Sequence, residues 1–188
     1  MRQNKRSPGI SFRLLAEGYF KSIENGKRLI DDGQVLLRNG RYLGAINFFR
    51  LATEEIIKAH LLNQPVTYNE GELEKWKWLW HAFHSHLEKQ KIILLEFHGK
   101  SFKDENEFNE TAKIIHSTRI DSIYVKFDFD KERFLSPEES LKYYGDLKTI
   151  AAREFEYAMA LFKYFTISGE LTIDEIERIF IMQHEDNI

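Results

Sequence analysis

Apolar residues recur every three or four positions along most of the chain, which is the period of an amphipathic helix. The first such run predicts a helix from Ser11, a favourable N-cap residue, to Arg38. Asn39-Gly40 ends it, and a second helix is predicted over residues 41–63. The apolar stripe of this second helix contains small residues that let a neighbouring helix approach closely: Ala45, Phe48, Phe49, Ala52, Ile56 and Ala59.

The pattern predicts two further helices before it changes. Asp104 or Asn106 is placed to cap the later one, which ends near Arg119 or Ile120. The earlier one covers residues 72–97, where apolar side chains alternate between spacings of four and three. This spacing is typical of a bundle seam, and Gln90 is its one polar member. The seam consists of Trp76, Trp80, Phe83, Leu87, Gln90, Leu94 and Phe97.

Helical periodicity breaks after residue 121. Residues 122–130 alternate apolar and polar side chains, which predicts an extended segment inside a longer excursion near 121–136. Ser136-Pro137-Glu138-Glu139 then combines an N-cap residue, a first-turn proline and two acids at the positive end of the helix dipole. The helix that starts there is predicted to reach Thr166, and Thr172 is predicted to cap a short final helix to about Met182.

Together these segments predict an all-α fold. Four long helices with short connections indicate an antiparallel helical bundle, to which a short C-terminal helix and the extended excursion near 121–136 are added. We expect one domain over residues 9–188, preceded by a flexible basic arm over residues 1–8.

Composition narrows the classes of function. The formal net charge of −3, from 27 Lys and Arg against 30 Asp and Glu, argues against nucleic-acid binding driven by bulk charge, although it leaves room for a local basic groove. The chain has no Cys, which excludes disulfides, thiolate catalysis and Cys-based zinc sites. No stretch approaches the roughly 20 apolar residues of a membrane span. We therefore expect a soluble cytoplasmic protein that has no membrane partner.

The second predicted helix carries the first group of candidate residues. Arg50, Glu54 and Lys58 are four residues apart, so they share a face and form a surface ion ladder in the simplest interpretation. Glu55 lies instead on the small-residue stripe, where a carboxylate needs a cationic or hydrogen-bonding partner. Glu55 is then either half of a buried structural pair or a functional acid.

The third predicted helix carries a cluster of histidines. His81, His84 and Glu88 have a spacing that could bind a metal, but we interpret their face as solvated and expect no metal or cofactor. His86 lies beside the seam with Lys89 about one turn further on. His86 is either a hydrogen-bonded core histidine or a general acid or base, beside an ammonium group that favours the neutral ring.

Arg119 lies on the inward stripe of the fourth predicted helix. An inward arginine needs an acid, and Glu55 is a plausible partner. A structural latch and a phosphate ligand are equally compatible with this position.

Three of these segments together resemble one known family, AbiV, whose members act in abortive infection. The segment Gly40–Ala59 resembles that family's A…LA-x-EE-x-x-K helix, with Glu54-Glu55 and Lys58 at the motif positions. Phe83, His86 and Lys89 are similar to its following F-x-x-H-x-x-K motif. Residues 119–128, followed by Ser136-Pro137, resemble its LYVD…P segment, and the likeness extends roughly over residues 30–137.

The resemblance implies a helical domain of the HEPN type and a role in phage defence. It implies that growth of the infected cell stops, with translation as the target, and that the protein is a homodimer with RNA or the translation machinery, and a phage-encoded activator, as partners. Many HEPN proteins are metal-independent ribonucleases with an Arg-x(4–6)-His signature. Only Arg178 and His184 have that spacing here, which is about what chance gives. The candidate catalytic residues therefore remain Glu55, Lys58, His86, Lys89 and Arg119.

Two hypotheses follow. In the first, the protein is an RNA-directed endonuclease, in which His86 acts on a ribose 2′-hydroxyl and Lys58, Lys89 or Arg119 stabilises the charge on phosphorus. In the second, the same residues form a buried polar latch in a non-catalytic binding or adaptor module. A buried Glu55–Arg119 pair with no cleft beside it would favour the second hypothesis.

Overall fold

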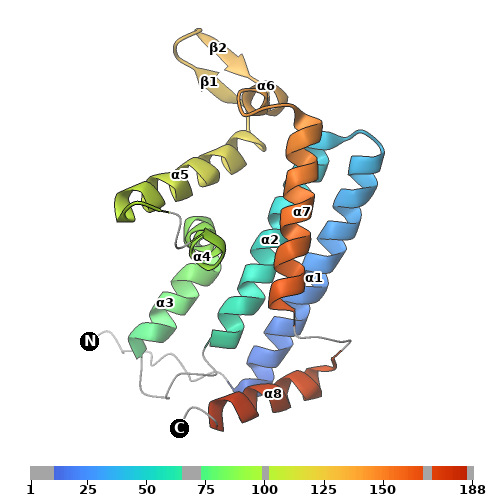
Figure 1. Cartoon of the computed structure of the whole chain (residues 1–188), viewed down its shortest axis with the longest axis vertical. Coiled ribbons are helices and arrows are strands. Elements are labelled where there is room, and N and C mark those ends of the chain that lie inside the picture. The colour runs from blue at the N-terminus through green and yellow to red at the C-terminus, as the bar shows by residue number, and fades with distance from the viewer. Residues whose placement is uncertain (1–10, 65–72, 99–101, 167–170, 186–188) are drawn as a thin grey trace, which may run out of the picture.

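The computed structural model describes residues 11–64, 73–98, 102–166 and 171–185, so the predicted arm at residues 1–8 lies outside the described residues. Helices dominate these ranges, and the all-α prediction is confirmed (Figure 1). The helices are α1 Phe12–Arg38, α2 Tyr42–Asn63, α3 Leu73–His84, α4 His86–His98, α5 Glu105–Asp121, α6 Pro137–Lys142, α7 Leu147–Phe165 and α8 Ile173–Glu185, and the strands are β1 Lys126–Asp128 and β2 Arg133–Leu135.

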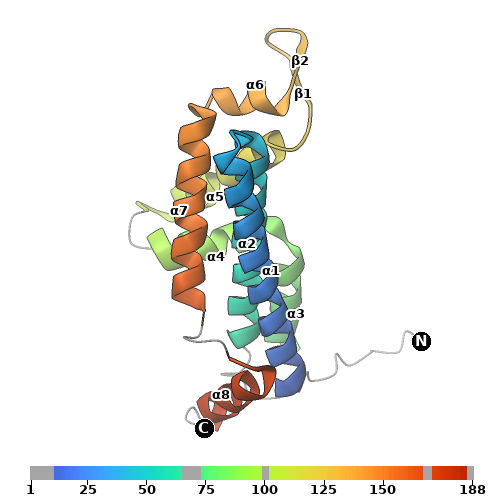
Figure 2. The same ribbon diagram turned by 90° about the vertical axis from the view of Figure 1, so that its right-hand side faces the viewer.

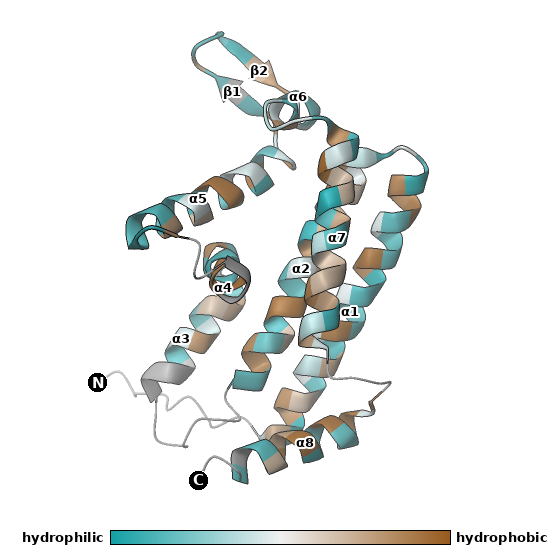
Figure 3. Ribbon diagram, viewed as in Figure 1, coloured by the Kyte–Doolittle hydropathy of each residue, from teal (hydrophilic) through white to brown (hydrophobic). Residues whose placement is uncertain are grey.

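Three long helices, α1, α2 and α7, lie side by side and form the body of the molecule (Figures 1 and 2). The chain turns between α1 and α2 at Gly40, whose φ of 69° is in the left-handed region that glycine adopts without strain. Helix α1 therefore runs opposite to α2, and α7 runs in the same direction as α2. Apolar and polar residues both occur along α1 and α8, as expected for helices with one buried side (Figure 3).

The contact between α1 and α2 is close because α1 has a glycine where α2 has a phenylalanine. A Cβ atom added at Gly33 would lie 2.5 Å from Cε1 of Phe49, a residue that is completely buried. The ring of Phe49 also packs against Phe155 of α7, with ring centroids 5.3 Å apart. Phe49 therefore fills the space between the three long helices, and Gly33 makes that space available.

Residues 72–97 were predicted to form one helix with a continuous apolar seam. The structure has two helices there, α3 and α4, so this prediction was wrong. Helix α4 is seen end-on in Figure 1 and lengthwise in Figure 2, and both views show that it runs in a different direction from α3. The break lies at Ser85, whose Oγ accepts a hydrogen bond from the backbone N–H of Glu88 at 3.2 Å and so caps α4. Nζ of Lys89 donates to the backbone carbonyl of Phe83 at 2.9 Å, which satisfies a carbonyl near the end of α3.

The predicted excursion near 121–136 is a short antiparallel hairpin, in which Phe127 of β1 is opposite Phe134 of β2. The capping box predicted at Ser136 is present, but the helix that it starts ends at Lys142 instead of reaching Thr166. A turn with Gly145 at φ 137° separates α6 from α7, and Asp146 caps α7. Residues 137–166 therefore form two helices, not one.

Gly33→Ala should reduce the free energy of unfolding by about 1 kcal/mol. Alanine gains about 1 kcal/mol of helix propensity, but displacing a ring held between two helices costs roughly 1–3 kcal/mol. Denaturant unfolding measures the difference. Gly44→Ala is the matched control, because there the added methyl comes no closer than 3.1 Å to a neighbour, the end of the partly exposed Leu36 side chain. Equal or higher stability of Gly33→Ala would contradict this account of the packing.

Candidate functional site

A cluster of charged and polar side chains lies where α2 faces α4 and α5. We call it the polar cluster and define it as Glu54, Glu55, Lys58, His86, Lys89, His116 and Arg119. All five candidate catalytic residues of the sequence belong to it. Glu54 and His116 are the two members that the sequence analysis did not propose as functional.

Glu54 is the centre of the polar cluster, and its prediction as part of a surface ladder was wrong. Only 3% of the residue is exposed. Its Oε1 lies 2.5 Å from Nε of Arg119, and its Oε2 lies 2.6 Å from Nδ1 of His86. Arg50 does not belong to a ladder either, because its guanidinium binds Glu154 of α7, with Nη2 2.9 Å from the carboxylate.

The contact between Glu54 and Arg119 replaces the predicted Glu55–Arg119 pair. The N–H bond at Nε does not point along the line to Oε1, so the contact is an ion pair without an aligned hydrogen bond. Glu55 instead binds Lys58 of its own helix, with 2.5 Å between Oε1 and Nζ. The ammonium of Lys58 also lies 5.4 Å from the ring centre of Phe83, a cation–π distance.

His86 is held by Glu54 but remains accessible. It is the first residue of α4, and 45% of its side chain is exposed. Donation from Nδ1 to the carboxylate fixes the neutral ring in the tautomer whose Nε2 is an acceptor. A buried carboxylate that orients an imidazole in this way is the arrangement by which proteins build a general base.

Lys89 is almost completely buried, with 1% of the residue exposed. Burial lowers the pKa of its ammonium, and the charge of Glu54 raises it in part. Because Nζ is bound to the carbonyl of Phe83, the contact that it makes stabilises the break between α3 and α4. A catalytic role for Lys89 remains a prediction.

His116 of α5 is the second histidine of the site. Its Nδ1 is buried and has no hydrogen-bond partner among the described residues. Burial lowers the pKa of its ring, the positive charge of Arg119 lowers it further, and the charge of Glu54 raises it in part. The sequence signal was available, since His116 precedes Arg119 by three residues and therefore shares its helix face.

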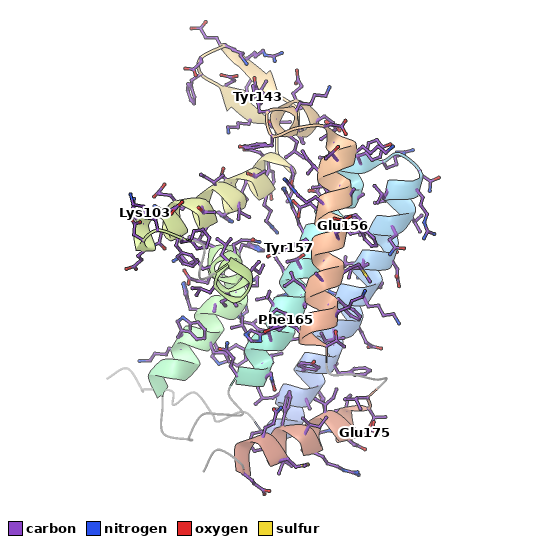
Figure 4. All side chains as sticks on the ribbon, in the orientation of Figure 1. Lys103, Tyr143, Glu156, Tyr157, Phe165 and Glu175 are labelled. Atoms are coloured by element: carbon purple, nitrogen blue, oxygen red, sulfur yellow. The ribbon has the colours of Figure 1, made fainter. Side chains whose placement is uncertain are left out.

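A cavity of about 310 Å³ lies beside the polar cluster, between α2, α4, α5 and α7. Arg119 lines it and is therefore in contact with both the cavity and Glu54. Figure 4 shows Tyr157, another lining residue, on the side of α7 that faces α4 and α5. The buried ion pair thus has a cleft next to it, which the latch hypothesis did not expect.

The remaining candidates lie apart from this arrangement. His81 and His84 are exposed on α3, and Glu88 binds Lys91 at 3.0 Å. Among the described residues, no group of three or more His, Cys, Asp or Glu side chains is arranged to hold a metal ion. Arg178 is exposed on α8, which lies away from α4 and α5 (Figures 1 and 2), and the side chain of His184 is outside the described residues.

Protonation of His116 should make stability depend on pH. Its folded pKa is lower than the ordinary value of 6.5, so the unfolded chain binds more protons between those two values. The free energy of unfolding should therefore rise with pH through that window and level off above about 6.5. Denaturant unfolding from pH 5 to 8 measures the slope. His116→Gln should flatten it, whereas His81→Gln, on the exposed face of α3, should leave it unchanged; an unchanged slope in His116→Gln would refute this origin.

We compared the sequence with known protein families, curated proteins and solved structures. Within the part of the chain that the structure describes, no helix is long and apolar enough to cross a membrane. No curated protein and no solved structure matches the chain significantly. A family model, HEPN_AbiV, described as AbiV, matches residues 14–144, a segment that runs from α1 to the end of α6 and contains the whole polar cluster. Because this match covers well over half of the 188 residues, the chain belongs to the AbiV family, which points to abortive infection, a form of phage defence.

Proposed function

We propose that this AbiV-family protein arrests the infected cell by inhibiting translation, and that it does so by cutting RNA at the polar cluster. One observation carries the proposal: a half-exposed imidazole, His86, is oriented by the buried carboxylate of Glu54 next to a cleft. A latch that only fixes helix positions gains nothing from an accessible ring. A general base needs one.

The proposed reaction uses the ribose of the RNA itself as nucleophile. Nε2 of His86 takes the proton of a 2′-hydroxyl, and the 2′-oxygen forms a bond to the adjacent phosphorus. The bond from phosphorus to the 5′-oxygen breaks, and the 5′-oxygen takes a proton from water. The products are a 2′,3′-cyclic phosphate and a 5′-hydroxyl, and His86 returns its proton to solvent. These steps need no metal ion.

Positive charge near the imidazole would stabilise the reacting phosphate. Lys58 is partly exposed and is held by Glu55, and Arg119 reaches the cleft from the other side of Glu54. Developing negative charge on phosphate oxygens is the kind of charge that preorganised cations stabilise in a site shielded from water. The nuclease hypothesis requires such cations in an otherwise acidic protein, and we propose Lys58 and Arg119 for this role.

The second candidate function is a non-catalytic module that holds a component of the translation machinery. The ion pair of Glu54 with Arg119 and the bond from Lys89 to Phe83 favour it, because both contacts are buried and join elements of the fold. In this case translation stops but RNA stays intact. A cytoplasmic location and a phage-encoded activator belong equally to both candidates.

Mapping RNA 5′ ends in phage-infected cells distinguishes the two candidates. Cells with the wild-type protein should show new ends at defined sites, and His86→Ala should reduce their yield by about 10²–10⁴-fold, the usual contribution of a general base. His84→Ala is the matched control, because His84 is exposed two residues earlier. Circular dichroism of both purified variants checks the fold. Arrested protein synthesis without new RNA ends would reject the nuclease and support the binding module.

We also propose that the protein acts as a homodimer. Trp78 is an exposed aromatic side chain on α3, and a protein interface is the usual place for such a residue. Sedimentation should give twice the mass of the chain, and Trp78→Glu should shift it toward the monomer. Lys77→Gln lowers the charge by the same one unit at the exposed neighbouring position and should leave the mass unchanged. A monomeric wild-type protein would refute the dimer.

A further inference from the structure

The cavity beside the polar cluster has its own pattern of charge. Three guanidinium groups line it, from Arg50, Arg119 and Arg153, together with the carboxylate of Glu154. Glu154 binds Arg50, and the buried Glu54 binds Arg119. Arg153 is exposed and has no ion-pair partner among the described residues, so one positive charge at the cavity is left uncompensated. The cavity is therefore suited to an anionic group at Arg153.

Gln90 gives the cavity an unusual polar feature. The residue is only 7% exposed, it lines the cavity, and its amide has no hydrogen bond to any described residue. Its amide atoms are not among the polar atoms that the described residues enclose completely, so a ligand in the cavity can reach them. Its donor and acceptor together match the edge of a nucleobase, which presents a donor and an acceptor side by side.

Apart from Thr53 of α2, the remaining lining residues of the cavity are apolar or aromatic. Ile93 and Leu94 come from α4, Ile115 from α5 and Tyr157 from α7. Burial, with the nearby charge of Glu154, raises the pKa of the Tyr157 phenol, which therefore stays protonated and neutral. An aromatic ring and apolar side chains next to a polar amide form a combination that can contact the faces of a base and hydrogen-bond to its edge.

The size of the cavity limits what it can hold. Its volume of about 310 Å³ is at the lower end of the range of small-molecule pockets, roughly 300–1,000 Å³. That is room for one nucleotide unit and not for a helix of RNA. The cavity also lies close to His86, the proposed general base. Gln90 follows His86 by one helical turn on α4, and Arg119 touches both the cavity and Glu54.

From these features we infer that the cavity binds one nucleotide unit, with its base at Gln90 and its phosphate at Arg153. This inference rests on the proposed RNA cleavage and gives it a specificity subsite: the nucleotide in the cavity adjoins the phosphate that is cut at His86. The same chemistry is offered by a nucleotide within RNA and by a free nucleoside monophosphate. In either case Gln90 determines which base is accepted, and Arg153 contributes affinity without base preference.

Binding measurements on the full chain test the subsite without requiring cleavage. The probes are the four nucleoside 5′-monophosphates and a short single-stranded RNA with 2′-fluoro sugars, which has no 2′-hydroxyl and cannot be cut by the proposed reaction. Arg153→Gln should weaken binding by about tenfold or more, the size of a lost charge-assisted hydrogen bond. Lys148→Gln, at an exposed position of the same helix, is the matched control. Gln90→Met, a change of similar size, should remove the preference among the four bases.

Each outcome decides the proposal. Binding of a monophosphate as tight as that of the oligonucleotide identifies a free nucleotide as the ligand, and binding of the oligonucleotide alone identifies RNA. No binding by any probe, or unchanged binding in both Arg153→Gln and Gln90→Met, would overturn the subsite. New RNA ends with unaltered site preference in Gln90→Met would overturn it and leave the nuclease standing. Intact binding without any RNA cleavage would leave the cavity standing and reject the nuclease.

Discussion

A buried carboxylate is the constraint on which the rest of this structure depends. Glu54 lies inside the protein on α2, and an ionised carboxylate without partners in that environment costs several kcal/mol. Its two oxygens therefore each require a positive or donating group, and the chain supplies Arg119 from α5 and His86 from α4. Neither partner helix could move away from α2 without leaving the charge of Glu54 uncompensated.

The break between α3 and α4 follows from the same requirement. The regular apolar spacing predicted one straight helix over residues 72–97, whose apolar side would pack along α2. In the structure the helix stops at Ser85 and restarts at His86, and the amine of Lys89 satisfies a carbonyl at the end of the first part. The break places the imidazole of His86 at the start of α4, where it binds Glu54 of α2.

The sequence predicted where several helices begin, but it predicted less well where one helix breaks and which side of a helix is buried. Helix starts at Ser11, Asp104, Ser136 and Thr172 were predictable because each is a local signal, a side chain that caps its own helix. Ser85 carries the same signal with Glu88 three residues later, but the unbroken apolar spacing around it concealed the break. Glu54 was misplaced for a different reason. Pattern analysis assumes that a helix has one buried side, whereas α2 is packed by α1, α7, α3 and α4, so its apparently polar face is interior as well.

The candidate residues therefore lie close together in the structure, but their pairing differs from the prediction, and their role at a site stays a prediction. Motifs from three helices converge on one region, where Lys58 binds Glu55 while His86 and Arg119 bind the adjacent Glu54. Which of two adjacent glutamates receives the arginine depends on how α2 is rotated about its axis. A difference of one residue corresponds to about 100° of that rotation, and only packing from all sides fixes it.

The joint at Ser85 has a geometric consequence for the cavity. When a rigid helix pivots at one end, each residue is displaced in proportion to its distance from the pivot. His86 is next to the pivot, whereas Leu94 is eight positions further on, about 12 Å along the axis at 1.5 Å per residue. A swing of α4 would therefore widen or narrow the cavity at its far wall and hardly move the imidazole. The chain thus separates the part of the site that must stay still from the part that can adapt its shape to what enters.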